Sequence, residues 1–513
     1  MSFASLPFVG LVAAGVILYY LVPKKLQWVV LLLASMVFYL AGGVKSAVWL
    51  VLVAAVTWLT GLLLARQNAR PAPDKQTKAA VRHVKKRICA VCAVLCFGLL
   101  YLMKYWNFTA SALPSALGDK LPRWDFVVPM GLSYFIFQAV GYVIDVYRGK
   151  TDAQKNPLRY GLFVSFFPQM VQGPISRYDQ LAPQLTAERR LDWRDLKFGI
   201  QLCLWGYFKK LVIADRLLVA VTALCGDPTA YSGAYVLLGA VFYAAELYAD
   251  FTGGIDITIG IAQVLGVSVK ENFIRPYFSR NIAEYWLRWH ISMGTWFKDY
   301  IFYPLSVAPW LLKLSKKARK SISDGFGKKL SVYVSTIVTW FLTGLWHGAA
   351  WNFVVWGLLN AFFILLAEEF KPLSVKFREK HARLVSGFGY RVFETLRTFF
   401  LMCSLRILDC YRDVAVSFKA FGSIFTTNNW GEAFSGELLK LGLTGADYIV
   451  AGVGVALMFA VSCVQEKCGC VRELMWKKTA VPYVVFALLA LCILVFGAYG
   501  VGYDSSQFIY NQF

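Results

Sequence analysis

Long apolar segments recur along this chain of 513 residues and restrict its fold more than any other feature. Each is close to the ~20 residues that an α-helix needs to cross the hydrocarbon core of a bilayer. The segments therefore predict membrane-spanning helices. They are Leu6–Val22, Leu26–Leu40, Ala47–Ala65, Ile88–Met103, Phe126–Val146, Leu330–Trp346, Trp351–Ala367, Val392–Leu408, Tyr448–Cys463 and Val481–Val501.

The composition supports a membrane protein, because hydrophobic residues make up 58% of the chain and charged residues only 16%. We predict an all-α polytopic membrane protein with roughly 11–13 spanning or re-entrant helices, forming a single multi-span domain over residues 1–513. Residues 125–370 are predicted to be the core that carries the site, with supporting spans in 1–124 and 392–513. The first apolar segment has no Lys or Arg before Lys24, so it is predicted to be a span rather than a cleaved signal peptide.

The formal net charge of +23 comes from basic residues that gather in short segments between apolar ones, notably 66–87, 313–329 and 371–383. This distribution is typical of cytoplasmic loops in membrane proteins. It places the N-terminus outside and the loop at 104–125 on the outer face. A nucleic-acid interface would need one basic face with base-stacking aromatic residues, so we expect no nucleic-acid partner.

Two further regions have an irregular pattern. Residues 160–175 are apolar but short, and they contain Pro168 and the pair Gly173-Pro174, which predicts a re-entrant or interfacial segment. That segment either lines a cavity or is a kinked packing helix.

Glu246 and Asp250 lie one helical turn apart in an apolar region and so share a helix face. Two interpretations remain for these carboxylates. They belong to an aqueous vestibule or proton relay, or they pair with basic residues at membrane depth. The candidate partners are Arg275, Arg280 and Lys209.

Four histidines occur in the whole chain, and two of them lie in aromatic surroundings. Residues 279–300 have aromatic residues at steps of three and four, with Glu284 and Arg288 as an i,i+4 pair, which predicts one amphipathic interface helix with His290 on its aromatic side. The second, His347, lies near the apex of a hairpin of two spans between the basic segments. Each histidine is either a proton-transfer residue or a packed structural side chain.

Gly344 and Gly348 bracket His347 one turn apart, which allows another backbone or a substrate to come close. Asn352 is placed to orient the imidazole or to bind a carbonyl group. Apolar, Trp-rich surroundings disfavour a charged imidazole, so we expect His347 to be neutral and available as a base.

Several motifs are absent from the sequence. It contains no G-x-x-x-x-G-K-[ST] phosphate-binding loop and no G-x-S-x-G hydrolase motif. Cys89 with Cys92, and Cys468 with Cys470, have no second ligand pair at zinc spacing nearby, so we predict no metal site. Two classes of function remain, namely a polytopic enzyme that uses a buried histidine and a transporter.

Three blocks of sequence resemble the membrane-bound O-acyltransferase (MBOAT) family, in particular its branch of alginate O-acetylation and D-alanyl teichoic acid transferase proteins. They are Asn272 to Ser292, Trp296 to Pro304, and Thr343 to Phe353, which hold both histidines. Further similarity lies in 128–138, 166–175 and 508–513. The chain departs from the family pattern at Asp250 to Asp256 and at Arg406 to Arg412. These departures bear on the identity of the acceptor or partner more than on the type of reaction.

The resemblance implies acyl transfer to an extracytoplasmic polymer, with His347 as the catalytic histidine and His290 as its partner in a tunnel. Trp289, Trp346, Asn352, Trp296 and Asp299 are the expected tunnel or substrate residues. The expected donor substrate is acetyl-CoA or an acyl-carrier thioester, with no bound cofactor. Expected partners are membrane lipid, a separate extracytoplasmic acetyltransferase, and a polysaccharide or teichoic acid acceptor. The expected location is the bacterial plasma membrane.

Overall fold

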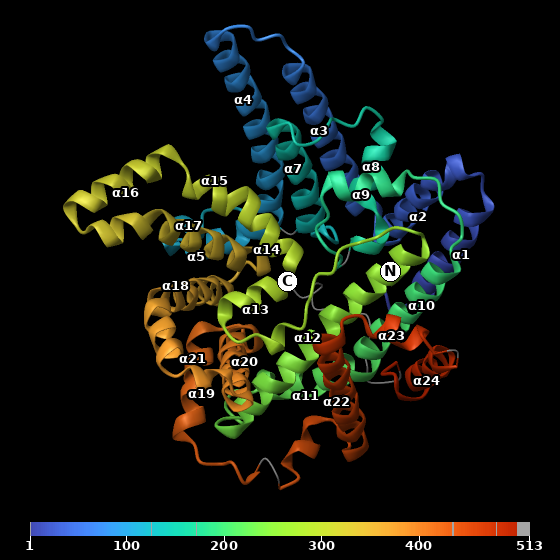
Figure 1. The fold of residues 1–513 in the computed structure, drawn as a ribbon, viewed down its shortest axis with the longest axis vertical. Coiled ribbons are helices and arrows are strands. Elements are labelled where there is room, and N and C mark those ends of the chain that lie inside the picture. The colour runs from blue at the N-terminus through green and yellow to red at the C-terminus, as the bar shows by residue number, and fades with distance from the viewer. Residues whose placement is uncertain (1, 125, 171, 433–434, 479, 500–513) are drawn as a thin grey trace. The chain divides into compact units, whose positions relative to one another are not determined.

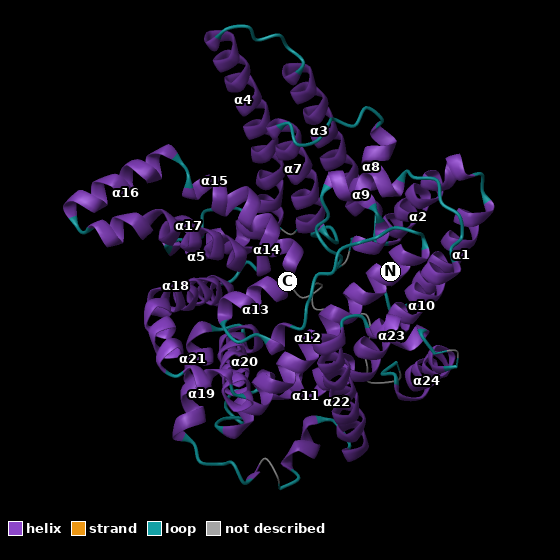
Figure 2. Ribbon diagram, in the orientation of Figure 1, coloured by secondary structure: helices purple, strands orange, loops and turns teal. Residues whose placement is uncertain are grey.

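The computed structural model describes residues 2–124, 126–170, 172–432, 435–478 and 480–499. Every regular element in these ranges is a helix, as Figure 2 shows, which confirms the predicted all-α class. The 508–513 match and the end of the predicted span Val481–Val501 lie outside the described residues. By internal contacts the chain divides into two units, and the single multi-span domain stays a prediction.

The first unit comprises residues up to Gly206 together with Gly254–Lys270. Helices α3, α4 and α7 pack side by side in it (Figure 1). Its helices are α1 (Leu6–Leu21), α2 (Gln27–Ala41), α3 (Val44–Asn68), α4 (Lys75–Leu100), α5 (Trp106–Ala112), α6 (Ser115–Gly118), α7 (Leu132–Arg148), α8 (Pro157–Ser165), α9 (Tyr178–Leu185) and α10 (Trp193–Tyr207). It also contains two short 3₁₀ helices, η1 (Lys24–Leu26) and η3 (Phe167–Gln169), and one π-helical segment, η2 (Tyr101–Tyr105).

The second unit comprises Tyr207–Gly253 and the chain from Glu271 onward, and α12 (Ala234–Val264) runs through the boundary at Gly253. It contains both histidines of interest. Its other elements are η4 (Phe208–Ala214), α11 (Asp215–Gly226), η5 (Pro276–Phe278), α13 (Ile282–Arg288), α14 (Ile291–Phe297), η6 (Lys298–Phe302), α15 (Tyr303–Ser306), α16 (Pro309–Ser321), α17 (Asp324–His347), α18 (Trp351–Lys380), α19 (Ala382–Ser386), α20 (Phe388–Tyr411), α21 (Val414–Thr426), η8 (Glu437–Leu441), α22 (Gly445–Cys468), α23 (Val471–Trp476) and α24 (Val481–Phe496).

Six helical stretches in the described residues are long and apolar enough to cross a membrane, which supports a multi-pass protein. Three shorter apolar helices, α1, α21 and α24, accompany them. The total number of crossings and their sidedness stay predictions. The six stretches are Lys24–Ala41, Val44–Asn68, Lys75–Ala112, Ala234–Val264, Trp351–Lys380 and Gly445–Cys468.

The basic segments predicted to be loops are largely helical, which corrects the sequence interpretation. Helix α4 begins at Lys75, α18 continues to Lys380, and α16 carries the basic residues of 313–320. Lys and Arg are good helix formers, so a helix continues past the end of its apolar part. The start of α4 is fixed by Asp74, whose carboxylate accepts a hydrogen bond from the Thr77 amide at 2.8 Å.

The irregular segment at 160–175 consists of α8 and η3, with buried side chains on both. Side chains from other helices of the first unit satisfy its backbone. The Ser35 hydroxyl accepts from the Phe167 amide at 3.2 Å, and the Thr258 hydroxyl donates to the Pro168 carbonyl at 2.7 Å. Irregular backbone at membrane depth requires such partners, and these contacts favour the packing interpretation of this segment.

Helices α17 and α18 form the predicted hairpin, and two glycines bring their backbones together. A Cβ atom on Gly344 would lie 2.3 Å from the carbonyl oxygen of Phe353. A Cβ atom on Gly357 would lie 2.4 Å from the carbonyl oxygen of Trp340. The small residue at 344 therefore admits another backbone, as predicted, and the apex of the hairpin is fixed by close packing.

Because backbone atoms cannot move aside as a flexible side chain can, we expect Gly344→Ala to destabilise the protein by about 1–3 kcal/mol through overpacking. Thermal unfolding of the purified protein in detergent measures this. Gly325→Ala is the matched control on the same helix, because nothing lies within 4 Å of its added Cβ. Equal unfolding temperatures for the two variants would contradict the close approach of the two backbones.

Candidate active site

The segment 279–300 is not one amphipathic helix, which corrects the sequence prediction. It forms α13 and α14, and His290 lies between them in the left-handed conformation with φ 46° and ψ 54°. The aromatic periodicity continues through the break, from Trp286 in α13 to Trp296 in α14. A periodic pattern therefore could not reveal the change in backbone direction.

His290 is fully buried. Its ring lies 5.0 Å from the ring of Phe251 and 6.2 Å from that of Phe273, measured between centroids. Nδ1 of His290 lies 3.1 Å from Nδ2 of Asn272. His290 lies outside the helices long enough to span, and burial holds the pKa of its imidazole well below the usual range. The ring is therefore neutral near pH 7.

His347 is the last residue of α17, at the apex of the hairpin, where the sequence placed it. Its imidazole contacts three aromatic rings and is only partly exposed. Centroid distances are 4.7 Å to Trp356, 5.0 Å to Trp346 and 6.4 Å to Phe353. The aromatic, largely apolar surroundings expected for this histidine are therefore present.

One indole ring joins the two histidines. The ring of Trp346 lies 5.6 Å from the His290 ring and 5.0 Å from the His347 ring. Trp346 is itself 5% exposed. The structure thus brings together two histidines that lie 57 positions apart in the sequence, with one aromatic side chain in contact with both.

Trp289, the residue directly before His290, is held by a contact with Arg406. The guanidinium carbon of Arg406 lies 4.3 Å from the centroid of the Trp289 ring, a distance typical of a cation–π contact. Arg406 also donates to the Tyr285 hydroxyl at 2.9 Å and lies 3.7 Å from the Asp409 carboxylate. The sequence indicated Arg406 only as a departure from the family pattern, so its support of Trp289 was missed.

The other predicted tunnel residues have different surroundings. Asn352 is buried and donates to the carbonyl of Leu408 at 3.1 Å, so it binds a carbonyl group. Trp296 is buried in α14 and its ring lies 5.1 Å from that of Tyr300. Asp299 lies half-buried in η6, one turn further along the chain. Their roles in a tunnel stay predictions.

Two buried acidic residues, Asp250 and Asp215, pair with a lysine that was not among the candidate partners. Nζ of Lys210 lies 2.5 Å from Asp250 and 2.7 Å from Asp215. Lys209, a predicted partner, instead donates to Thr252 at 2.7 Å. Pairing is the interpretation that the structure supports for Asp250, whereas the neighbouring Glu246 is buried with Oε2 outside any hydrogen bond.

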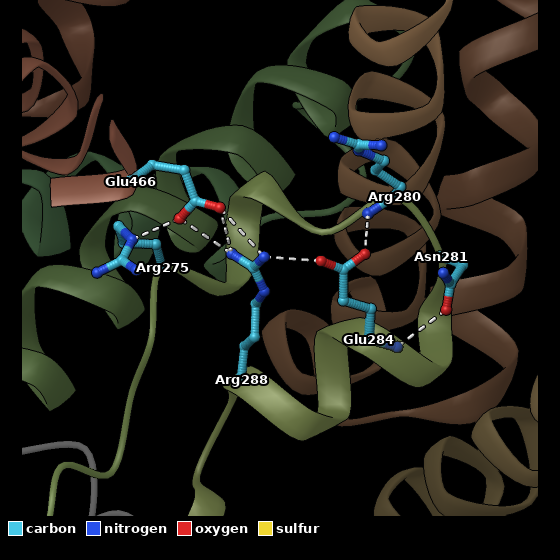
Figure 3. Close-up of polar contacts among 6 residues, drawn as sticks. All are labelled: Arg275, Arg280, Asn281, Glu284, Arg288 and Glu466. Atoms are coloured by element: carbon cyan, nitrogen blue, oxygen red, sulfur yellow. Dashed lines mark hydrogen bonds and ion pairs between the residues drawn. The ribbon is translucent and has the colours of Figure 1, made fainter. Parts of the chain in front are cut away.

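Arg275, another candidate partner of these carboxylates, belongs to a separate ion cluster (Figure 3). The Glu466 carboxylate on α22 accepts from Arg275 at 2.6 Å and from Arg288 at 3.1 Å. Arg288 also pairs with Glu284 at 2.8 Å, which confirms the predicted i,i+4 pair. Sequence separation hides this cluster, because Glu466 is almost 180 positions from Arg288.

At the start of α13, the Asn281 side chain accepts a hydrogen bond from the Glu284 amide at 2.9 Å. The ion cluster and this cap hold both ends of the short helix that precedes His290. In the described residues, no group of three or more His, Cys, Asp or Glu side chains is arranged to hold a metal ion.

Comparison with known proteins shows which enzyme family the chain resembles. The sequence profile of the MBOAT, membrane-bound O-acyltransferase family matches residues 31–405. A Pseudomonas aeruginosa protein named "probable alginate O-acetylase" is 30% identical over 83% of this chain and 75% of its own length. A peptidoglycan O-acetyltransferase of Helicobacter pylori is 28% identical over 54% of this chain and 55% of its own length.

A teichoic acid D-alanyltransferase of Bacillus subtilis is 27% identical over 59% of this chain and 73% of its own length. The family match includes α13, α14 and the hairpin, and thus both histidines that contact Trp346. The chain therefore belongs to the membrane-bound O-acyltransferase family and is an acyltransferase with several membrane-spanning helices.

Proposed function

We propose that this enzyme transfers an acyl group, acetyl in the first instance, from a cytoplasmic thioester to a hydroxyl group of a cell-envelope or extracellular polysaccharide. The observation that carries this proposal is the pair of imidazoles in contact with one indole. The activities for which the relatives are named support the substrate class. Residence in the bacterial plasma membrane, as expected from the sequence, is part of the proposal.

In the proposed reaction, the acceptor hydroxyl oxygen attacks the thioester carbonyl carbon and the carbon–sulfur bond breaks. His347 takes the hydroxyl proton, and the proton passes to the departing thiolate sulfur. A general base must be neutral to do this, and we take His347, whose ring lies against those of Trp346, Trp356 and Phe353, to be neutral. An alternative role for His347 is to polarise the thioester carbonyl.

His290 is the second histidine that the acyl group passes in the proposed path. It positions the donor or acceptor, and Trp289, Trp346 and Asn352 line the site, with Trp296 and Asp299 further along. Support is strongest for Trp346, which contacts both imidazoles. Asn352 is 1% exposed and has a buried Oδ1 in no hydrogen bond, so it retains an acceptor for a substrate hydroxyl or amide.

The proposed donor is acetyl-CoA or an acyl-carrier thioester, used as substrate and not as a resident cofactor. An extracytoplasmic acetyltransferase of the serine-hydrolase type is the proposed partner, since this chain contains no G-x-S-x-G motif. D-alanyl transfer to teichoic acid is the second candidate, supported by the Bacillus subtilis relative. Acetyl transfer is preferred because the alginate-type similarity extends over more of the chain, 83% against 59%.

We expect His347→Ala to lower acyl transfer by ~10²–10⁴-fold, the usual contribution of a placed proton-transfer residue, without loss of the protein from the membrane. Acylated polymer in cells, together with the amount of enzyme in the membrane fraction, measures this. His381→Ala is the control, because His381 is an exposed histidine at the end of α18. Full polymer acylation in cells with His347→Ala would overturn the assignment.

A transporter and an enzyme differ in the product that they leave. We expect membrane vesicles that contain the protein together with its proposed partner, supplied with labelled acetyl-CoA and envelope polysaccharide, to form a new acetyl–oxygen ester on the polymer. The label is followed into base-labile ester. Movement of labelled solute without ester formation would favour the transporter class, and ester formed only from a D-alanyl carrier thioester would favour the second candidate.

A further inference from the structure

Asn272 makes hydrogen bonds to three consecutive residues at the break between α13 and α14. Its main-chain carbonyl accepts from the Ile291 amide at 2.9 Å. Its side-chain Oδ1 accepts from the Ser292 amide at 2.9 Å, and its Nδ2 lies 3.1 Å from Nδ1 of His290. A nearby bond from the Ile274 amide to the Arg288 carbonyl, also 2.9 Å, holds the two stretches of chain together.

These contacts cap the N-terminus of α14 in place of its own N-cap residue. The first amide groups of a helix have no partner inside the helix, and the residue before it usually supplies one. His290 occupies that position but its side chain makes no capping bond. Because Asn272 accepts from the Ile291 and Ser292 amides instead, the imidazole of His290 is not needed for capping.

The Ser292 amide also determines how the Asn272 side chain is oriented. A backbone N–H can only donate, so the group that faces it must be the oxygen Oδ1. The other end of the amide, Nδ2, then faces the imidazole. Amide nitrogen can only donate, so Nδ1 of His290 is the acceptor of this bond. The competing approach of Nδ1 to Oδ1 is longer, at 3.4 Å.

A neutral imidazole carries one hydrogen, on one of its two nitrogens. With Nδ1 as acceptor, the hydrogen is on Nε2. Full burial among the rings of Phe251 and Phe273 opposes a second proton, since a charged imidazole would lose its hydration. The tautomer of His290 is therefore set by a residue 18 positions away in the sequence.

We propose that Asn272 is a positioning residue that holds His290 as the Nε2–H tautomer, so that His290 donates a hydrogen bond during acyl transfer and His347 takes the proton. This rests on the proposed function. The chemical group recognised is the acyl carbonyl oxygen, which becomes negatively charged when the hydroxyl attacks. A preorganised donor stabilises that charge, whereas a second base would not.

The backbone at His290 requires this support. The left-handed conformation is uncommon for a residue with a side chain and persists only where the surroundings hold it. The hydrogen bonds of Asn272 with residues 290, 291 and 292 stabilise this conformation. One asparagine thus fixes the backbone, the cap of α14 and the tautomer together.

The decisive variant is Asn272→Asp, which separates capping from the tautomer. A carboxylate still accepts from the Ser292 amide, and the main-chain carbonyl is unchanged, so the cap of α14 remains. A carboxylate cannot donate to Nδ1, so His290 is expected to move its hydrogen to Nδ1. Asn281→Asp is the matched control, because Asn281 caps α13 in the same way through the Glu284 amide.

The tautomer is measured by long-range ¹H–¹⁵N correlation spectra of full-length protein in detergent, labelled with ¹⁵N-histidine. Four histidines in the chain make the spectrum simple, and His83→Gln with His381→Gln leaves the two of interest. We expect the pattern of an Nε2–H imidazole for His290 in the parent protein and in Asn281→Asp. In Asn272→Asp we expect an Nδ1–H imidazole, whose Nε2 has no hydrogen to donate.

Acyl transfer by the same proteins is the second readout. We expect Asn272→Asp to lower kcat by about 10²–10³-fold, as loss of an oxyanion donor does, with little change in KM and with Asn281→Asp close to the parent. An Nδ1–H imidazole in the parent protein, or full activity of Asn272→Asp, would overturn the proposal. The spectrum of the protein with an intact Asn272 needs no substrate, so it decides the tautomer even if Asn272→Asp does not fold.

The spectrum also separates this inference from the proposed function. An Nε2–H imidazole at His290 with an active His347→Ala enzyme would contradict the role of His347 and leave the tautomer standing. An Nδ1–H imidazole with an inactive His347→Ala enzyme would contradict the proposed tautomer and leave the role of His347 standing.

Discussion

The arrangement of the site depends on the hydrogen bonds that satisfy the backbone amides at the break between α13 and α14. Where α13 ends and α14 begins, unsatisfied amide groups would be costly, because little water can reach them. Asn272 supplies the acceptors for the Ile291 and Ser292 amides. The break is stable for this reason, and it turns the chain so that His290 lies among Phe251, Phe273 and Trp346.

Two other sets of contacts hold the same short segment. The Arg406 guanidinium lies over Trp289 and bonds to Tyr285, so the residue before His290 is fixed by a buried cation. Glu466 binds Arg275 and Arg288 and thereby links the residue before η5 and the end of α13 to α22 (Figure 3). A catalytic group must be held in one geometry, and residues outside the reacting centre supply that rigidity here.

The hairpin of α17 and α18 provides the other histidine by different means. Its position depends on glycine, because the backbone of Phe353 can approach Gly344 only when no side chain is present. His347 at the end of α17 is then in contact with Trp356 and Trp346. The two histidines therefore rely on separate supports, hydrogen bonds for His290 and close backbone packing for His347, and they meet at one indole.

The amino-acid sequence alone determined the class of the protein, the positions of most helices and the two histidines as candidates. Apolar length and the scarcity of histidine carry this information locally, so no contact between distant residues is needed. Helix ends were harder to predict, because α4 and α18 continue into basic residues that also favour helix.

Only the tertiary structure decided that α13 and α14 are separate, that Lys210 is the partner of Asp250, and that Trp346 contacts both histidines. It also revealed the bond from Asn272 to His290 and the position of Arg406 over Trp289. The physical reason is that each of these depends on residues far apart in the chain, so hydropathy and periodicity within one segment do not contain them.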